Sequence, residues 1–169
     1  MANMVSSDVG PAPDIDGRAG FVAALIWAVS AAASTDARKM WWVDPDFSDW
    51  PLNDAVLLTS LAGWLQQPQR KLVLLATDYG PMERLHPRFV TWRRTWGHAI
   101  EPYSLPEDEG LVLPTLAVVG PHACVELLDR TYWRGRAGID PQHTRLLADE
   151  IDALVQRSSA DFPVTRLGL

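Results

Sequence analysis

The chain has 169 residues, eight of them Trp and only one Cys, with 47% hydrophobic residues and a formal net charge of −6. This length suits one domain, and the ordinary share of charged residues excludes disorder along the whole chain. The lone Cys124 excludes an intramolecular disulfide framework and a cysteine-rich zinc site. The negative charge argues against non-specific binding to nucleic acid or anionic lipid, although it is compatible with a local basic patch.

The N-terminal part divides into a polar tail and an apolar run. Residues 1–17 are rich in Ser, Asp, Pro and Gly, and we expect a flexible tail there, followed by a single domain at 18–169. The uncharged run 19–35 predicts either a core-packed helix or the apolar part of a signal segment. Three Asp and a single Arg precede it, which disfavours a signal segment, and its length and Ala content disfavour a membrane span. We expect a buried helix, a cytoplasmic protein and no membrane partner.

Apolar runs and amphipathic segments then alternate along the chain. We expect strands at 39–44, 72–76, 99–105, 111–119 and 123–128, and helices from a cap at Asn53 to Pro68, from Pro87 to Gly97 and from Asp140 onward. The early alternation predicts parallel strands, and the last two close strands predict an antiparallel addition. Residues 129–136, with three Arg and two aromatic residues, are expected to form a loop. The sequence therefore predicts a single-domain α/β sandwich with a mixed sheet.

This order of elements resembles one half of the phospholipase D-like superfamily. A strand of that family carries the pattern His-x-Lys-x-x-x-x-Asp, and the run from Leu113 to Gly120 is similar to it in its apolar positions. The opening "ARKMWWVDPDF" and the closing helix "LLADEIDALVQRSS" also match, so that the resemblance covers residues 19–159. It implies a phospholipase D/nuclease-like α-β-α sandwich, and it implies that two chains pair as a homodimer to complete a two-fold site.

The sequence is also similar to a group of small bacterial proteins of this fold that lack the motif. The shared segments are a "DPDxSDWPL"-like stretch at 44–52, a His-Pro-Arg at 86–88 and a "TxLGL" ending at 165–169. In the superfamily the motif His attacks phosphorus, the Lys binds phosphate and the Asp supports the site. Leu113, Thr115 and Gly120 stand at these positions here. Leu cannot attack phosphorus, and Thr offers no charge to the transition state. We therefore expect a degenerate, catalytically inactive module that binds a ligand or a protein and needs no cofactor.

An enzyme with other residues is the alternative hypothesis. The segment from Asp44 to Ser48 is similar to the Asp-x-Asp-x-Ser/Thr start of haloacid dehalogenase-like phosphatases, where the first Asp is the nucleophile beside Mg²⁺. Thr77 fits the second motif of that family. Its mechanism also needs a later Lys, and no Lys follows Lys71. A Mg²⁺-dependent phosphatase or nuclease that uses Asp44 and Asp46, or displaced catalytic residues, therefore stands second to an Asp-Pro turn after a buried strand.

The candidate binding residues follow from the predicted sheet. Acids end two predicted parallel strands, where open α/β sheets bind ligands, and Arg side chains of the expected loop can hold an anion or stack on bases. The candidate ligand-binding residues are Asp44, Asp46, Asp78, His86, Arg130, Arg134 and Arg136. The partner would be an unidentified protein or a small anionic ligand; nucleic acid is left open but is not favoured by the net charge. A third hypothesis is a regulatory subunit that docks a partner through Trp50, Trp64 and Trp133. We assign no catalytic or metal-binding residue, and Cys124 is expected in the core.

Overall fold

The computed structural model describes residues 9–107 and 110–162, so residues 1–8 of the expected tail and the "TxLGL" ending lie outside the described residues. Within these ranges one mixed sheet has the strand order β1-β7-β6-β5-β2-β3-β4-β8. The strands are β1 (Ile15–Asp16), β2 (Lys39–Val43), β3 (Lys71–Ala76), β4 (Ile100–Ser104), β5 (Thr115–Gly120), β6 (Ala123–Asp129), β7 (Arg134–Ile139) and β8 (Ser159–Ala160). The helices are α1 (Arg18–Ala33), α2 (Ala55–Leu65), α3 (Gly80–Leu85), α4 (Pro87–Arg93) and α5 (Pro141–Gln156), with a 3₁₀ turn at Arg94–Trp96.

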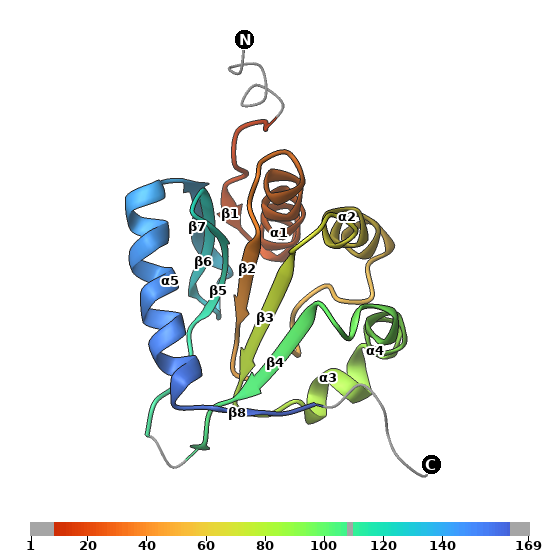
Figure 1. The fold of residues 1–169 in the computed structure, drawn as a ribbon. Coiled ribbons are helices and arrows are strands. Elements are labelled where there is room, and N and C mark those ends of the chain that lie inside the picture. Colours follow the sequence, from red (N-terminus) through yellow and green to blue (C-terminus); the bar gives the residue numbers. More distant parts are fainter. Residues whose placement is uncertain (1–8, 108–109, 163–169) are drawn as a thin grey trace.

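Helices cover the two faces of the sheet unequally. Helices α1 to α4 lie on one face, and α5 alone lies on the other (Figure 1). Successive side chains of β2 point to opposite faces: Met40 and Trp42 belong to the larger core under α1 and α2, whereas Trp41 and Val43 belong to the smaller core under α5. Because both faces of the central strands are buried, these strands are nearly continuous apolar runs. The α-β-α sandwich expected from the sequence is confirmed.

The strand directions are also those expected. Strands β2, β3 and β4 are parallel, and β5 is antiparallel to both β2 and β6. Strands β2 and β3 therefore end at the same edge of the sheet, the lower edge in Figure 1. This edge positions the first candidate site.

The expectation of a loop at 129–136 is wrong at its end, because its last three residues begin β7. Residues 134–139 pair with β6, with Arg136 opposite Glu126 and Gly135 opposite Leu127. The sequence RGRAGI has few large apolar residues, so it lacks the run that marks the inner strands. Gly135 is required by packing, because a Cβ there would lie 2.1 Å from the carbonyl oxygen of Glu126. The glycines that let β7 pack closely against β6 are also typical of loops, so the sequence pattern does not reveal this strand.

Three smaller expectations need correction at element ends. The described end of the expected tail is tied to the sheet, since Ile15 and Asp16 pair with β7. Helix α2 is capped by Asp54 and not by Asn53; the Asp54 carboxylate accepts hydrogen bonds from two backbone amides of the first turn. The run expected as a strand from residue 111 forms strand only from Thr115 onward, because Pro114 has no N–H for the sheet.

The surface proposed for a Trp-rich partner site is also wrong. Trp50 and Trp64 are fully buried in the larger core, and only Trp133 is partly exposed. The indole N–H of Trp64 donates to the carbonyl of Ala37 at 2.9 Å, which fixes α2 against the start of β2. In the described part of the chain, none of the helices has both the length and the apolar character of a membrane span.

Candidate functional site

Asp44 follows β2 directly, and its carboxylate is the centre of a closed hydrogen-bond network. Its side chain is only 1% exposed. Oδ2 accepts the backbone N–H of Asp46 at 3.0 Å and that of Phe47 at 2.7 Å. Oδ1 accepts the hydroxyl of Thr115 and the guanidinium of Arg130, the latter at 2.6 Å. Each oxygen thus has two donors, which uses the hydrogen-bonding capacity of a carboxylate.

The local sequence explains why this carboxylate turns inward. Asp and Asn after a strand readily accept hydrogen bonds from amides two and three residues on, and the Asp-Pro-Asp sequence folds as such a turn. Asp46 repeats the arrangement by accepting the N–H of Ser48 at 3.0 Å. His86, at the junction of α3 and α4, holds the same loop from the other side: its Nε2–H donates to the carbonyl of Phe47 at 2.8 Å. His86 is buried and therefore supports the loop.

The three positions that resemble the superfamily motif do not meet at this site. Thr115, in the position of the motif Lys, bonds to Asp44. Leu113, in the position of the motif His, is buried in the core under α5. Gly120 ends β5 at the opposite edge of the sheet and faces the ring of Trp41, where a Cβ would lie 2.8 Å from the nearest ring carbon. At the three positions of this resemblance the chain thus has a buried apolar side chain, a hydroxyl bonded to Asp44 and a glycine packed against Trp41.

A pocket of about 360 Å³ lies at the ends of β2 and β3, beside the Asp44 turn. Its lining includes the acidic residues Asp46, Asp78 and Glu107 and the apolar stretch 111–113. Asp78 is exposed, and one oxygen of its carboxylate accepts the N–H of Gly80 at 2.8 Å. Both Thr77 and Asp78 donate their N–H to the carbonyl of Pro45, so the two strand-end loops are held together. The pocket thus combines negative charge with an apolar wall.

The structure divides the sequence-predicted residues among separate places. Asp44 and Arg130 form one ion pair, and Asp46 and Asp78 line the neighbouring pocket. His86 lies beneath the Asp44 loop. Arg134 and Arg136 point elsewhere: Arg134 lies 3.8 Å from Asp16 beside β1, and Arg136 lies 3.0 Å from Glu126 on the α5 side of β7. Because β7 intervenes, the three Arg residues do not share one loop.

Sequence reasoning missed a second group of polar residues on the α5 side of the sheet. Cys124, Glu126 and His143 bring one ligand atom each to within 4.8 Å of one another. Cys124 and Glu126 are two apart on β6, so they share a face, and this spacing was the available signal. His143 has no ligand-like spacing to the other histidines along the chain. The return of the chain through β7 and the start of α5 brings it to β6.

Comparison with known proteins identifies the fold. No family model matches the chain, and no curated protein matches it. Among solved structures, the archaeal chromatin protein TrmBL2, reported to show a novel mode of DNA binding, is similar over 95% of this chain with a TM-score of 0.63 and 11% identity. Nuc from Salmonella typhimurium, a phospholipase D family member, is similar over 82% of this chain and 90% of its own, with a TM-score of 0.53 and 9% identity. The chain has a phospholipase D-like fold. It spans 57% of the length of TrmBL2.

At these identities the likeness concerns the fold alone. It agrees with the resemblance found in the sequence, because Nuc is a member of the phospholipase D family. The chemistry at the strand ends must be argued from the side chains of this chain.

Proposed function

We propose that this chain is a non-catalytic phospholipase D-like module that binds a ligand or a partner protein at the pocket where β2 and β3 end. The observation that carries the proposal is the saturation of Asp44. A nucleophilic carboxylate needs a free oxygen aimed at the substrate, and each Asp44 oxygen already accepts two hydrogen bonds. Leu113 and Thr115 supply neither the nucleophile nor the cation of the superfamily. The same saturation counts against the phosphatase hypothesis on Asp44.

The pocket chemistry favours a cationic ligand group over the anionic one that the Arg residues suggest. Asp46, Asp78 and Glu107 place negative charge around a partly apolar wall, and a cationic amine or a basic peptide segment complements this combination. The guanidinium of Arg130, one of the Arg residues expected to hold an anion, donates to Asp44 and does not line the pocket. A nucleic acid would need a basic surface to neutralise phosphates, and the net charge of −6 works against it.

A thermal-shift titration with spermidine tests the binding part of the proposal. Inorganic phosphate serves as the anionic comparison. At a spermidine concentration of 100 Kd, the stabilisation is about 2.7 kcal/mol, which raises Tm by roughly 5–10 °C for a domain of this size. The Asp46→Asn/Asp78→Asn double variant should lose most of this shift, and Asp149→Asn, an exposed acid on α5, should keep it. A larger shift with phosphate, or equal shifts in both variants, would refute the cationic pocket.

A hydrolysis assay tests the absence of catalysis. Bis(p-nitrophenyl) phosphate and p-nitrophenyl phosphate, each with and without Mg²⁺, probe diester and monoester cleavage. We expect rates equal to the protein-free background. Turnover that Asp46→Asn abolishes and Asp49→Asn, an exposed acid of the same loop, retains would overturn the proposal in favour of an enzyme. Light scattering during gel filtration would test the homodimer that the family resemblance implies.

A further inference from the structure

A mixed cluster of thiol, carboxylate and imidazole lies on the α5 face of the sheet, on a strand two removed from β2, which leads to Asp44. Cys124 pairs with Val118, which pairs with Trp41, three residues before Asp44. With strands about 4.8 Å apart and a rise of about 3.3 Å per residue, the Cα atoms of Cys124 and Asp44 are roughly 14 Å apart. Glu126 pairs with Leu116, which pairs with Val43, so its Cα is roughly 10 Å from that of Asp44. The pocket beside the cluster and the pocket described above have no lining residue in common.

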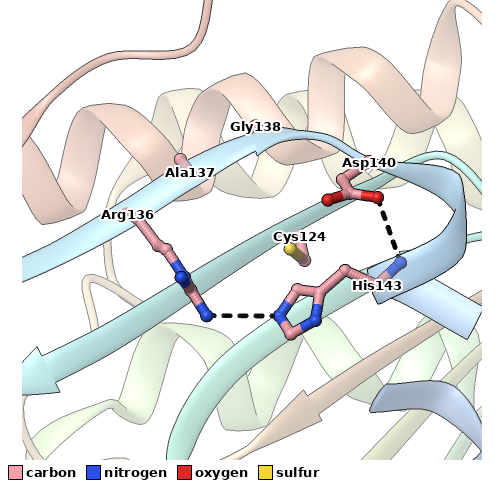
Figure 2. A pocket seen from close by; sticks show the side chains of 6 residues that line it. All are labelled: Cys124, Arg136, Ala137, Gly138, Asp140 and His143. Carbon is pink, nitrogen blue, oxygen red and sulfur yellow. Dashed lines mark hydrogen bonds between the residues drawn. The ribbon is translucent and has the colours of Figure 1, made fainter. Parts of the chain in front are cut away.

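Three elements build the cluster. Strand β6 presents Cys124 and Glu126 on its α5 side, β7 places Arg136 directly opposite Glu126, and the first turn of α5 contributes His143. Asp140 caps α5 by accepting the backbone N–H of His143 at 3.1 Å, which fixes the start of the helix over the strands (Figure 2). The imidazole of His143 and the side chain of Arg136 meet in front of the sulfur of Cys124, as Figure 2 shows.

The distances suit a small cation. Nε2 of His143 lies 2.8 Å from Oε1 of Glu126, and the sulfur of Cys124 completes a triangle whose atoms are all within 4.8 Å of one another. A tetrahedral zinc ion, with bonds of about 2.0–2.3 Å, separates its ligand atoms by roughly 3.3–3.6 Å. Side-chain rotations that move the sulfur, the carboxylate oxygen and the imidazole nitrogen by about 1 Å would therefore bring them to ligand distance.

The surroundings of the sulfur support a ligand site. The cluster borders a pocket of about 300 Å³, lined by Cys124, Arg136 and His143 among others. The hydroxyl of Thr144 is fully buried and has no hydrogen bond of standard geometry. It lies beside the thiol of Cys124. A buried hydroxyl without a hydrogen-bond partner requires a physical explanation, and an ion bound beside it is one such explanation.

We propose that Cys124, Glu126 and His143 form a binding site for a divalent transition metal of the zinc class. Thiolate, imidazole and carboxylate are the three ligand types of Zn²⁺, and three protein ligands leave a fourth position that opens to the pocket. On binding, the sulfur–metal bond replaces the S–H bond and the thiol proton leaves to solvent. His143 binds as the neutral imidazole, with its remaining proton on Nδ1.

Arg136 is the competitor for the same ligands. Its Nε lies 3.0 Å from Oε1 of Glu126, and its Nη2 lies 3.5 Å from Nε2 of His143. The guanidinium thus occupies the charge position that the metal would take. The Arg136 side chain is 62% exposed, so it can swing into water when the metal enters. Loss of this cation should make metal binding tighter, whereas a purely structural Arg136–Glu126 pair predicts no such effect.

A titration of the full-length protein with Co²⁺, a spectroscopic probe for zinc sites, tests the proposal. Because Cys124 is the only cysteine, a near-ultraviolet thiolate-to-cobalt band can arise only from this residue. We expect that band at one equivalent, and we expect Zn²⁺ to abolish it by displacement. His143→Gln and Glu126→Gln should weaken Co²⁺ binding by at least about 100-fold, since loss of even an indirect support of a metal ligand weakens affinity 10- to 100-fold. Arg136→Gln should strengthen it by roughly 2- to 5-fold, the equivalent of one partly exposed ion pair.

The matched control is His122→Gln. His122 forms an exposed pair with Asp36 at 3.2 Å, so it is a histidine–carboxylate pair outside the cluster. Its loss should leave the thiolate band and the Co²⁺ affinity unchanged. Absence of a thiolate band in the folded wild type, or an affinity that His122→Gln lowers and His143→Gln does not, overturns the proposal. Cys124→Ser removes the sulfur ligand. If that variant does not fold, the rate at which iodoacetamide alkylates the wild-type thiol decides instead, and equal rates with and without Zn²⁺ refute the site.

Discussion

The Asp44 network is the part of the structure on which the proposed loss of catalysis depends, and truncation at Asp44→Ala probes it directly. The substitution leaves the N–H of Phe47 and the hydroxyl of Thr115 without an acceptor, and both are buried. Each buried donor left unsatisfied costs about 1–3 kcal/mol. The Arg130 side chain is 45% exposed, so it can turn to water and contributes little. We therefore expect Asp44→Ala to destabilise the fold by about 3–5 kcal/mol, as for other buried pairs that lose one partner.

Two milder variants give the expected order. Asp44→Asn keeps one oxygen for the loop amides but loses the ion pair, so we expect about 1–3 kcal/mol. Arg130→Gln removes a half-exposed partner, and solvent screening limits its effect to about 1 kcal/mol or less. Urea denaturation followed by tryptophan fluorescence measures all three, because eight Trp report on the cores. For a domain of this size, 3–5 kcal/mol also lowers Tm by roughly 6–20 °C.

The sign of the effect separates a structural carboxylate from a catalytic one. Residues placed for catalysis are often held at a cost to the fold, and their replacement then leaves stability unchanged or raises it. If Asp44→Ala unfolds at the same urea concentration as the wild type, or at a higher one, the network is not a structural device and the reasoning fails. A large loss in Asp44→Ala that is not shared in part by Thr115→Val would contradict the assignment of the hydroxyl as a partner.

Three further predictions concern the fold. Gly135→Ala should destabilise the fold by about 2 kcal/mol or more, because the added Cβ would lie 2.1 Å from the carbonyl oxygen of Glu126. Gly138→Ala is the control on the same strand. Its Cβ would have no atom within 4 Å, so the urea midpoint should change little. Asp54→Ala should lower stability by about 1 kcal/mol through the loss of the α2 cap, and circular dichroism during heating would detect the lower Tm. The free energy of unfolding should fall above pH 10, because burial raises the pKa of Tyr79 in the folded chain above its ordinary value of 10.0. The unfolded chain therefore loses the phenol proton first as the pH rises. The stabilisation from the protonated phenol is complete below pH 10 and decreases by up to about 1.4 kcal/mol per pH unit above it. Tyr79→Phe should flatten this alkaline decline, and an unchanged slope would contradict the assignment.

The inner strands could be predicted from the sequence because burial on both faces leaves a simple signature. Strand β2 and strand β3 are apolar runs that end in polar residues, and their parallel pairing follows from the helix between them. The same reasoning located Asp44 and Asp78 at one edge of the sheet. It failed for β7, which has Gly135 and Ala137 on one face of the sheet and Arg134 and Arg136 on the other. An alternation of two was present there, but without large apolar side chains it resembles a loop.

The candidate site was predicted in position but not in detail. A sequence pattern can place Asp44 after a strand, yet it cannot show that its oxygens accept from Thr115 and Arg130, which are 71 and 86 residues away. The cluster at Cys124 was missed for a related reason. Its three ligands come from β6 and α5, and only the unrecognised strand β7 brings the chain back to join them.

The strand-end site at Asp44 and the cluster at Cys124 can be tested for independence in one experiment. Asp44→Asn perturbs the strand-end site and His143→Gln the cluster on the α5 face, whose two strand residues lie roughly 10 Å and 14 Å from Asp44 by strand geometry. Sites this far apart, with no shared partner, contribute additively to stability within about 0.3–0.5 kcal/mol. We therefore expect the double variant to lose the sum of the two single losses in urea denaturation, and we expect Asp44→Asn to bind Co²⁺ with wild-type affinity. A deviation of more than about 1 kcal/mol would mean that β5 and β6 couple the pocket to the metal cluster. The strand-end pocket and the metal site would then be energetically coupled parts of one functional site.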